Sequence, residues 1–201
     1  MTQKAGIKIK SQTKREINPR KDEPSQNQER ALEQEKMKKL LASGAAVRNV
    51  VGINNSVLRA KTKKVEIFDK RLWALLEDMK LTTLYSIGVG LAAPQIAISK
   101  KIVVVMVNDA EFEFINPEIS NEEGESILME GCLSLPSSMD CLVKRPQKLT
   151  LTYQDRHGVK HVDNFEGILA RIICHEVDHL NGILFIDKKY TPTAEEITKV
   201  Q

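Results

Sequence analysis

The sequence has few cysteines and no long apolar run, and both features limit what the protein can be. Its three cysteines, Cys132, Cys141 and Cys174, are an odd number and do not form the paired disulfide framework of small secreted proteins. The longest apolar run, residues 102–107, is far shorter than the roughly 20 residues of a membrane-spanning helix. The N-terminus also lacks the apolar segment of a secretory signal. We therefore expect no membrane association, and a reducing compartment, either a cytoplasm or the interior of an organelle.

A second feature is the motif His175-Glu176-Val177-Asp178-His179. Apolar residues recur at helical spacing before it, and Gly182 follows as a stop, so we predict a helix here. Two histidines four residues apart lie on the same face of a helix and can reach one metal ion. Glu176 is offset by about 100° around the helix, where a general base can border the metal without binding it. The alternative is a surface helix with solvated polar side chains.

The chain lacks any histidine or cysteine after Gly182, so the downstream third ligand of many His-Glu-x-x-His hydrolases is missing. The upstream segment Glu130-Gly131-Cys132-Leu133-Ser134 offers a thiolate instead. Cys132, His175 and His179 would form a three-ligand site with one open position, as catalytic metals require. The alternative for Cys132 is a small buried apolar residue.

Three blocks, taken together, resemble the signature motifs of peptide deformylases: Gly88-Val89-Gly90-Leu91-Ala92-Ala93-Pro94-Gln95, Glu130-Gly131-Cys132-Leu133-Ser134 and His175-Glu176-Val177-Asp178-His179-Leu180. The resemblance covers roughly residues 56–188. It implies a bacterial or organellar metal-dependent hydrolase that removes the formyl group from the N-formyl-methionine of newly made polypeptides. It also implies one divalent metal ion, usually Fe(2+), with Zn(2+), Ni(2+) or Co(2+) often found instead.

The same resemblance assigns roles to individual residues. It makes Glu176 the residue that accepts the proton of the attacking water, and it gives the formyl oxygen two donors, the Gln95 side-chain amide and the backbone N–H of Leu133. Without the resemblance, Gln95 would be interpreted as an ordinary loop residue. Glu130 is the candidate acceptor for the second nitrogen of a ligand histidine, and Arg145 could orient it. A surface ion pair is the alternative for these two residues.

The methionine side chain needs an apolar pocket, which the family builds from its first motif and its catalytic helix. The corresponding positions are Val89, Leu128, Ile168, Ile172 and His175. Each apolar member could equally belong to the core. Gly88 and Gly90 lack a Cβ, so we expect their backbone to lie against a bound peptide. The roles of Asp178 and Cys141 stay open, whereas Cys174 is expected in the core.

Charge divides the chain into two parts. Residues 1–46 hold eleven Lys or Arg against six Asp or Glu, a balance of +5, which leaves −2 for the remainder. We predict a basic, partly disordered N-terminal extension with a helix over residues 26–42, followed by one catalytic domain at residues 47–201. The Lys and Arg side chains of the extension could bind ribosomes by attraction to RNA phosphate groups, without recognising any nucleic-acid sequence. It could also be a transit segment, because its first fifteen residues contain no acid, or simply a solvated tail.

The expected fold class is α+β, with antiparallel strands packed around the helix that carries His175 and His179. Residues 102–107 should be a buried strand, with 113–119 returning beside it, and residues 149–153 and 159–165 should form a hairpin. Asp69 should begin an amphipathic helix that ends near Tyr85. Two other functions remain open: a general metallopeptidase and a non-catalytic ribosome-binding homologue.

Overall fold

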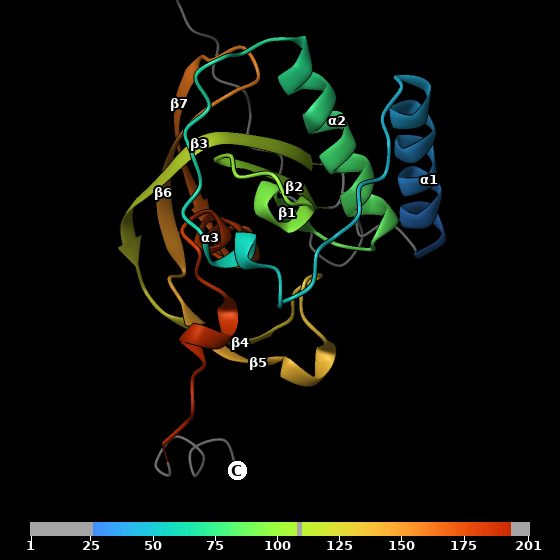
Figure 1. Ribbon diagram of the computed structural model, residues 1–201. Helices are drawn as coiled ribbons and strands as arrows, with labels where there is room; N and C mark the ends of the chain where they lie inside the picture. Colours follow the sequence, from blue (N-terminus) through green and yellow to red (C-terminus); the bar gives the residue numbers. More distant parts are fainter. Residues whose placement is uncertain (1–25, 108–109, 194–201) are drawn as a thin grey trace, which may run out of the picture.

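The computed structural model describes residues 26–107 and 110–193 and has the predicted α+β architecture (Figure 1). One antiparallel sheet has the strand order β1-β2-β3-β6-β7, and β4 and β5 form a separate antiparallel pair. The strands are β1 Gly90–Ala92, β2 Ile102–Val107, β3 Ala110–Glu123, β4 Ser126–Glu130, β5 Cys141–Arg145, β6 Lys148–Gln154 and β7 Lys160–Glu166. The helices are α1 Gln26–Ala42, α2 Lys70–Tyr85 and α3 Gly167–Leu180. None of the helices in the described ranges is long and apolar enough to cross a membrane.

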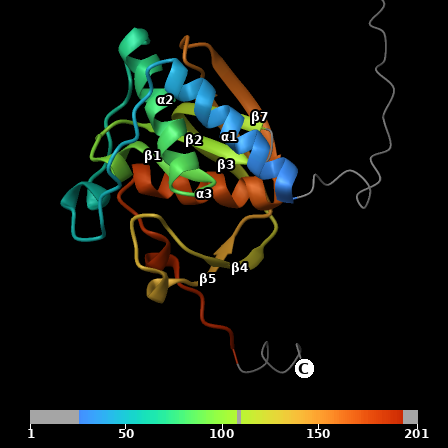
Figure 2. The ribbon, with the colours of Figure 1, turned by 90° about the vertical axis from the view of Figure 1, so that its right-hand side faces the viewer.

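Helix α3 lies between the two sheets (Figure 2). Side chains alternate along a strand, so β2 faces two different layers. Val103 and Val105 pack in the cluster that contains Ile173 of α3, while Val104 packs with Leu76 of α2 on the opposite face. Coverage of both faces explains why β2 is apolar throughout.

Helix α2 begins where the sequence predicts. The Asp69 side chain accepts hydrogen bonds from the backbone N–H groups of Arg71 and Leu72, which caps the helix. Helix α1 lies beside α2 (Figure 1). Leu40 of α1 is buried, and Lys36 Nζ lies 3.9 Å from Glu111 Oε1 of β3. The extension is therefore docked on the domain over its helical part.

The β4–β5 pair is a feature that the sequence analysis does not predict. Cys141, whose role was left open, begins β5 and is buried in one apolar cluster with Phe185. The predicted hairpin of β6 and β7 is confirmed.

The end of α3 is tied to a segment more than a hundred residues earlier. A Cβ added at Gly182 would lie 2.5 Å from the carbonyl oxygen of Arg59, so only glycine fits there without a shift. The Thr62 N–H also donates to the Leu180 carbonyl at 3.0 Å. These contacts fix the position of the helix that carries the motif.

Candidate metal centre and active site

The structure brings the three predicted ligand side chains together. The candidate ligand atoms of Cys132, His175 and His179 all lie within 4.8 Å of one another, and Cys132 Sγ lies 3.3 Å from His179 Nε2. The two histidines come from successive turns of α3, and Cys132 comes from the loop after β4. Glu176 and His179 are buried, so the alternative of a solvated surface helix is wrong.

The chemistry of these donors fits a divalent transition metal. Thiolate and imidazole are ligands that iron, zinc and nickel accept. His175 Nδ1 lies 3.0 Å from Glu130 Oε2, which leaves its Nε2 for a metal. Burial and the nearby His175 lower the pKa of His179 to about 3, so this ring is neutral. At His175, burial alone would lower the pKa, but hydrogen bonds with Cys132 and Glu130 outweigh it and raise the pKa to about 10, so metal binding there would release a proton. The residues present therefore fit the group that the motif implies.

Glu130 is the centre of a buried network beneath His175. Arg145 donates to both Glu130 oxygens at 3.0 Å, and it also pairs with Asp178. Arg145 is 2% exposed, so the alternative of a surface ion pair is wrong. Burial alone would raise the pKa of Glu130, but hydrogen bonds from His175 and Arg145 outweigh it and lower the pKa to about 2. The acceptor that faces His175 is therefore a carboxylate.

Arg171 is a member of this network that the sequence analysis misses. Its NH1 donates to Glu130 Oε1 at 2.6 Å, and its NH2 donates to the Ser126 carbonyl at 2.7 Å. The sequence did contain a signal for this role. Arg171 stands among apolar residues of a helix expected to be buried, and a buried charge requires a partner. Asp178, whose role was open, accepts from Arg145 and Lys188 and so supports the same network.

Glu176 occupies the position expected for a general base. It is 5% exposed, lines the pocket, and its Oε2 has no hydrogen-bond partner among the described residues. Burial raises the pKa of Glu176 to about 7, which suits a group that accepts and returns a proton near neutral pH. A Cβ added at Gly90 would lie 2.6 Å from Glu176 Oε1, so glycine at residue 90 gives this carboxylate its room.

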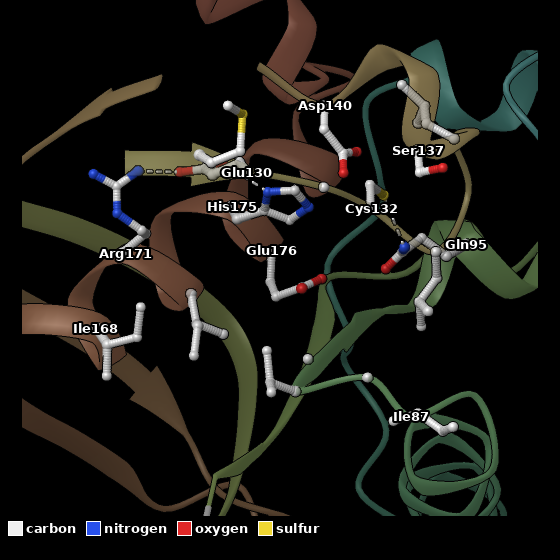
Figure 3. Close-up of a pocket in the computed structure, with 18 residues that line it drawn as sticks. Ile87, Gln95, Glu130, Cys132, Ser137, Asp140, Ile168, Arg171, His175 and Glu176 are labelled. Atoms are coloured by element: carbon white, nitrogen blue, oxygen red, sulfur yellow. Dashed lines mark hydrogen bonds and ion pairs between the residues drawn. The ribbon is translucent and has the colours of Figure 1, made fainter. Parts of the chain in front are cut away.

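Gln95 is held in one orientation by its own carbonyl group. Gln95 Oε1 accepts from the Ala92 N–H at 2.8 Å, so the amide nitrogen points to Cys132 Sγ, 3.4 Å away (Figure 3). The buried Gln95 side chain therefore presents a donor beside the three candidate ligands. Leu133 follows Cys132 directly and lines the same pocket.

These groups border a pocket of about 430 Å³, the size range of small-ligand sites. Val89, Gly90, Ile168 and Ile172 line it, together with His175, Glu176 and Gln95. Leu128 is not among its lining residues and is 49% exposed, whereas its neighbour Met129 does line the pocket. Leu128 and Glu130 are two residues apart on strand β4 and therefore share the face on which Glu130 meets His175, so the role expected of Leu128 stays a prediction.

The two glycines of the first motif are packed closely by protein side chains. Glu176 fills the space beside Gly90, and a Cβ at Gly88 would lie 2.9 Å from the Leu133 side chain. Both glycines also line the pocket, and the contact of their backbone with a bound peptide stays a prediction. Cys174 packs in the core as predicted.

A partly buried Cys-His-His cluster with a carboxylate and an amide donor at one pocket defines the class: a metal-dependent hydrolase. The family model described as polypeptide deformylase matches residues 47–195. A peptide deformylase of Caldicellulosiruptor bescii is 46% identical over 151 residues, 75% of this chain and 90% of that protein. One of Thermoanaerobacter pseudethanolicus is 48% identical over 143 residues, 71% and 89% of the two chains. The crystal structure of the Thermotoga maritima peptide deformylase has a TM-score of 0.71 and 35% identity, covering 73% of this chain and 99% of that one.

The chain belongs to the peptide deformylase family. It is a metal-dependent hydrolase that removes the formyl group from N-formyl-methionine at the N-terminus of polypeptides. The two alternatives, a general metallopeptidase and a non-catalytic homologue, are not favoured.

Proposed function

We propose that Cys132, His175 and His179 hold one divalent metal ion and that Glu176 is the general base in deformylation. The metal, when bound, supplies Lewis-acid activation of water and of the formyl carbonyl. The donor set supports this assignment, because it combines thiolate and neutral imidazole with a second acceptor behind His175.

Residues of the chain carry out proton transfer, stabilisation of the formyl oxygen and binding of the methionine side chain. Glu176 accepts the proton of the attacking water and later donates it to the amine of methionine as formate leaves. The Gln95 amide and the Leu133 N–H donate to the formyl oxygen while negative charge develops on it. Val89, Leu128, Ile168 and Ile172 surround the methionine side chain with apolar surface, and Met129, which lines the same pocket, adds to it.

The observation that carries this proposal is the unpartnered carboxylate oxygen of Glu176, buried in the same pocket as Cys132 and His175. A buried acceptor without a partner is costly, and such groups are common where chemistry requires them. The test is formate release from formyl-Met-Ala-Ser, measured beside internal peptide-bond cleavage of the same peptide and beside release of acetate from acetyl-Met-Ala-Ser. Formate alone supports the proposal, whereas internal cleavage with the formyl group left in place contradicts it.

We propose Fe(2+) as the metal in the cell, with Zn(2+), Ni(2+) or Co(2+) as substitutes in purified protein. Metal analysis of protein purified without oxygen tests this proposal. Titration with actinonin tests the proposed active site rather than the identity of the metal. A peptide deformylase of Synechococcus elongatus, 33% identical and with a TM-score of 0.68 over 76% of this chain and 82% of that one, has been crystallised with that compound.

We also propose that residues 1–46 are an extension that places the enzyme near ribosomes, while residues 47–201 form the catalytic domain. The +5 balance of the extension supports this, because clustered Lys and Arg attract phosphate charge in a salt-dependent way. A cytoplasmic location, next to nascent formylated chains, follows from that role. Residues 1–25, on which the transit-segment alternative depends, lie outside the described residues.

A further inference from the structure

Gln95 lies on a short element that is too small to be stable by itself. Residues Ala93–Ile96 form a single 3-10 turn, and the hydrogen-bond geometry of such turns is poorer than that of an α-helix. The turn ends at Ala97, whose φ of 61° lies in the left-handed region, which residues other than glycine adopt only when their surroundings enforce it. Contacts from outside the turn must therefore fix the backbone that carries the Gln95 amide.

One such contact comes from the segment between α1 and α2. We call residues 48–51 the strap; it passes α2 before it reaches the turn (Figure 1). The Val51 N–H donates to the Gln95 carbonyl at 2.8 Å, and Val50 packs against the apolar cluster that contains Ala93 and Ile96. The last carbonyls of a helix lack partners within it, so the strap provides the donor that the Gln95 carbonyl needs.

The other end of the strap is anchored on α2 by a buried carboxylate. Asp78 Oδ2 accepts from Arg48 Nε at 2.8 Å and from Arg48 NH2 at 2.5 Å. The Arg48 backbone N–H donates to the Thr82 hydroxyl, one helical turn further along, at 2.9 Å. The Asp78 side chain is only 8% exposed, and a carboxylate this buried requires its donors. The anchor is therefore more firmly held than an ion pair at the surface.

We propose that Arg48, held by Asp78, is a positioning residue that keeps the Gln95 amide aimed at the formyl oxygen. This inference rests on the proposed function, in which Gln95 is an oxyanion donor. Three residue steps separate Arg48 from Val51, at most about 10 Å of chain, so a strap fixed at Arg48 leaves Val51 little freedom. An oxyanion donor acts only within about 3 Å of the developing charge, and a small misplacement is costly. Arg48 does not line the pocket, so it acts through Gln95.

The test is a double-mutant cycle in the metal-loaded full-length enzyme, with formyl-Met-Ala-Ser as substrate. Arg48→Met removes the donors to Asp78 and keeps a long side chain. It should lower kcat by about 10-fold with KM within about 2-fold, because the oxyanion develops only in the transition state. In a Gln95→Leu background the same substitution should change kcat by less than about 2-fold, because no side-chain donor remains to be positioned.

Two further variants control for stability. Arg48→Lys keeps a charge beside Asp78 and should bring kcat to within about 3-fold of the parent. If Arg48→Met does not fold, Arg48→Lys carries the same cycle with a smaller amplitude. Glu77→Gln breaks a different pair of α2, with Arg156, and should lower Tm while kcat stays at the parental value.

Hydrogen exchange gives a measurement that is independent of activity. Arg48→Met should accelerate backbone exchange over residues 93–98, because the turn loses its external support, whereas Glu77→Gln should leave it unchanged. Exchange at the parental rate in Arg48→Met would overturn the inference.

Three kinetic results would also overturn it: equal losses of kcat in the parental and Gln95→Leu backgrounds, a change confined to KM, or a similar fall in kcat for Glu77→Gln. A Gln95→Leu enzyme with parental kcat would instead contradict the proposed function, because Gln95 would then not stabilise the oxyanion.

Discussion

Glu130 Oε2 and His175 Nδ1 lie 3.0 Å apart, and the two residues come from different layers of the fold. Glu130 ends strand β4, while His175 lies on α3. Arg145 and Arg171 hold the same carboxylate, so its position is fixed from two sides. The orientation of the candidate metal ligand is thus set by a strand that contributes no ligand itself.

Glu130→Gln should weaken metal binding by about 10- to 100-fold, the usual effect of losing an outer acceptor. Competition against a chelator, at fixed pH, measures the change. Glu125→Gln, which alters only a surface pair with Lys144, is the matched control and should bind metal like the parent. Equal affinity of all three proteins would rule out an orienting role for Glu130.

Arg145→Met should destabilise the fold by about 3–5 kcal/mol, because it leaves the buried carboxylates of Glu130 and Asp178 poorly compensated. Urea unfolding of the metal-loaded proteins provides the free energies. Lys148→Met breaks an exposed pair with Glu166 and should cost about 1 kcal/mol at most. Similar losses for both variants would contradict the distinction between buried and exposed pairs.

Glu176→Gln should reduce formate release by at least about 10²- to 10⁴-fold while metal stays near one per chain, because an amide cannot accept the proton. Glu166→Gln, an exposed residue next to the start of the same helix, serves as the control. A Glu176→Gln variant with parental turnover would remove Glu176 from the chemistry.

Gln95→Leu should lower kcat by about 10²- to 10³-fold with a smaller change in KM, the loss expected for one oxyanion donor. The substitution also removes the bond from Ala92 N–H, so thermal unfolding must be measured in parallel. A normal Tm combined with low kcat separates the two effects. If KM rises and kcat is unaffected, Gln95 binds the substrate only.

Deletion of residues 1–46 should leave kcat within about 2-fold, because every candidate site residue lies beyond residue 46. Stability should fall by roughly 1.5–3 kcal/mol, because the apolar surface buried by Leu40 against the domain is lost. Co-sedimentation with ribosomes should decrease, with the largest difference at low salt. Unchanged co-sedimentation would exclude the proposed placement role.

Local patterns were sufficient for the main elements of the fold. The Asp69 cap, the apolar run of β2 and the hairpin of β6 and β7 each depend on neighbouring residues, so periodicity and turn chemistry predict them. The Cys132, His175 and His179 cluster was predicted from the motif and the missing downstream ligand.

Features that depend on tertiary contacts were not predictable in the same way. The pair β4–β5 places Leu128 and Glu130 on one face of β4, and only the tertiary structure shows that Glu130 meets His175 there. Arg171 reaches Glu130 across 41 positions of sequence, and no local pattern specifies that partner. The left-handed backbone conformation of Ile87, with φ = 55°, could likewise be found only in the structure.

The tight contact of Gly182 with Arg59 bears on the order in which activity can arise during synthesis. The candidate ligands span Cys132 to His179, and the end of α3 is fixed only when Gly182 meets a segment made much earlier. Domains fold as units, and long-range contacts form late because their loops must close first. A nascent chain that carries only the first two motifs lacks both candidate histidines, so we expect deformylase activity only after residue 182 has left the ribosome.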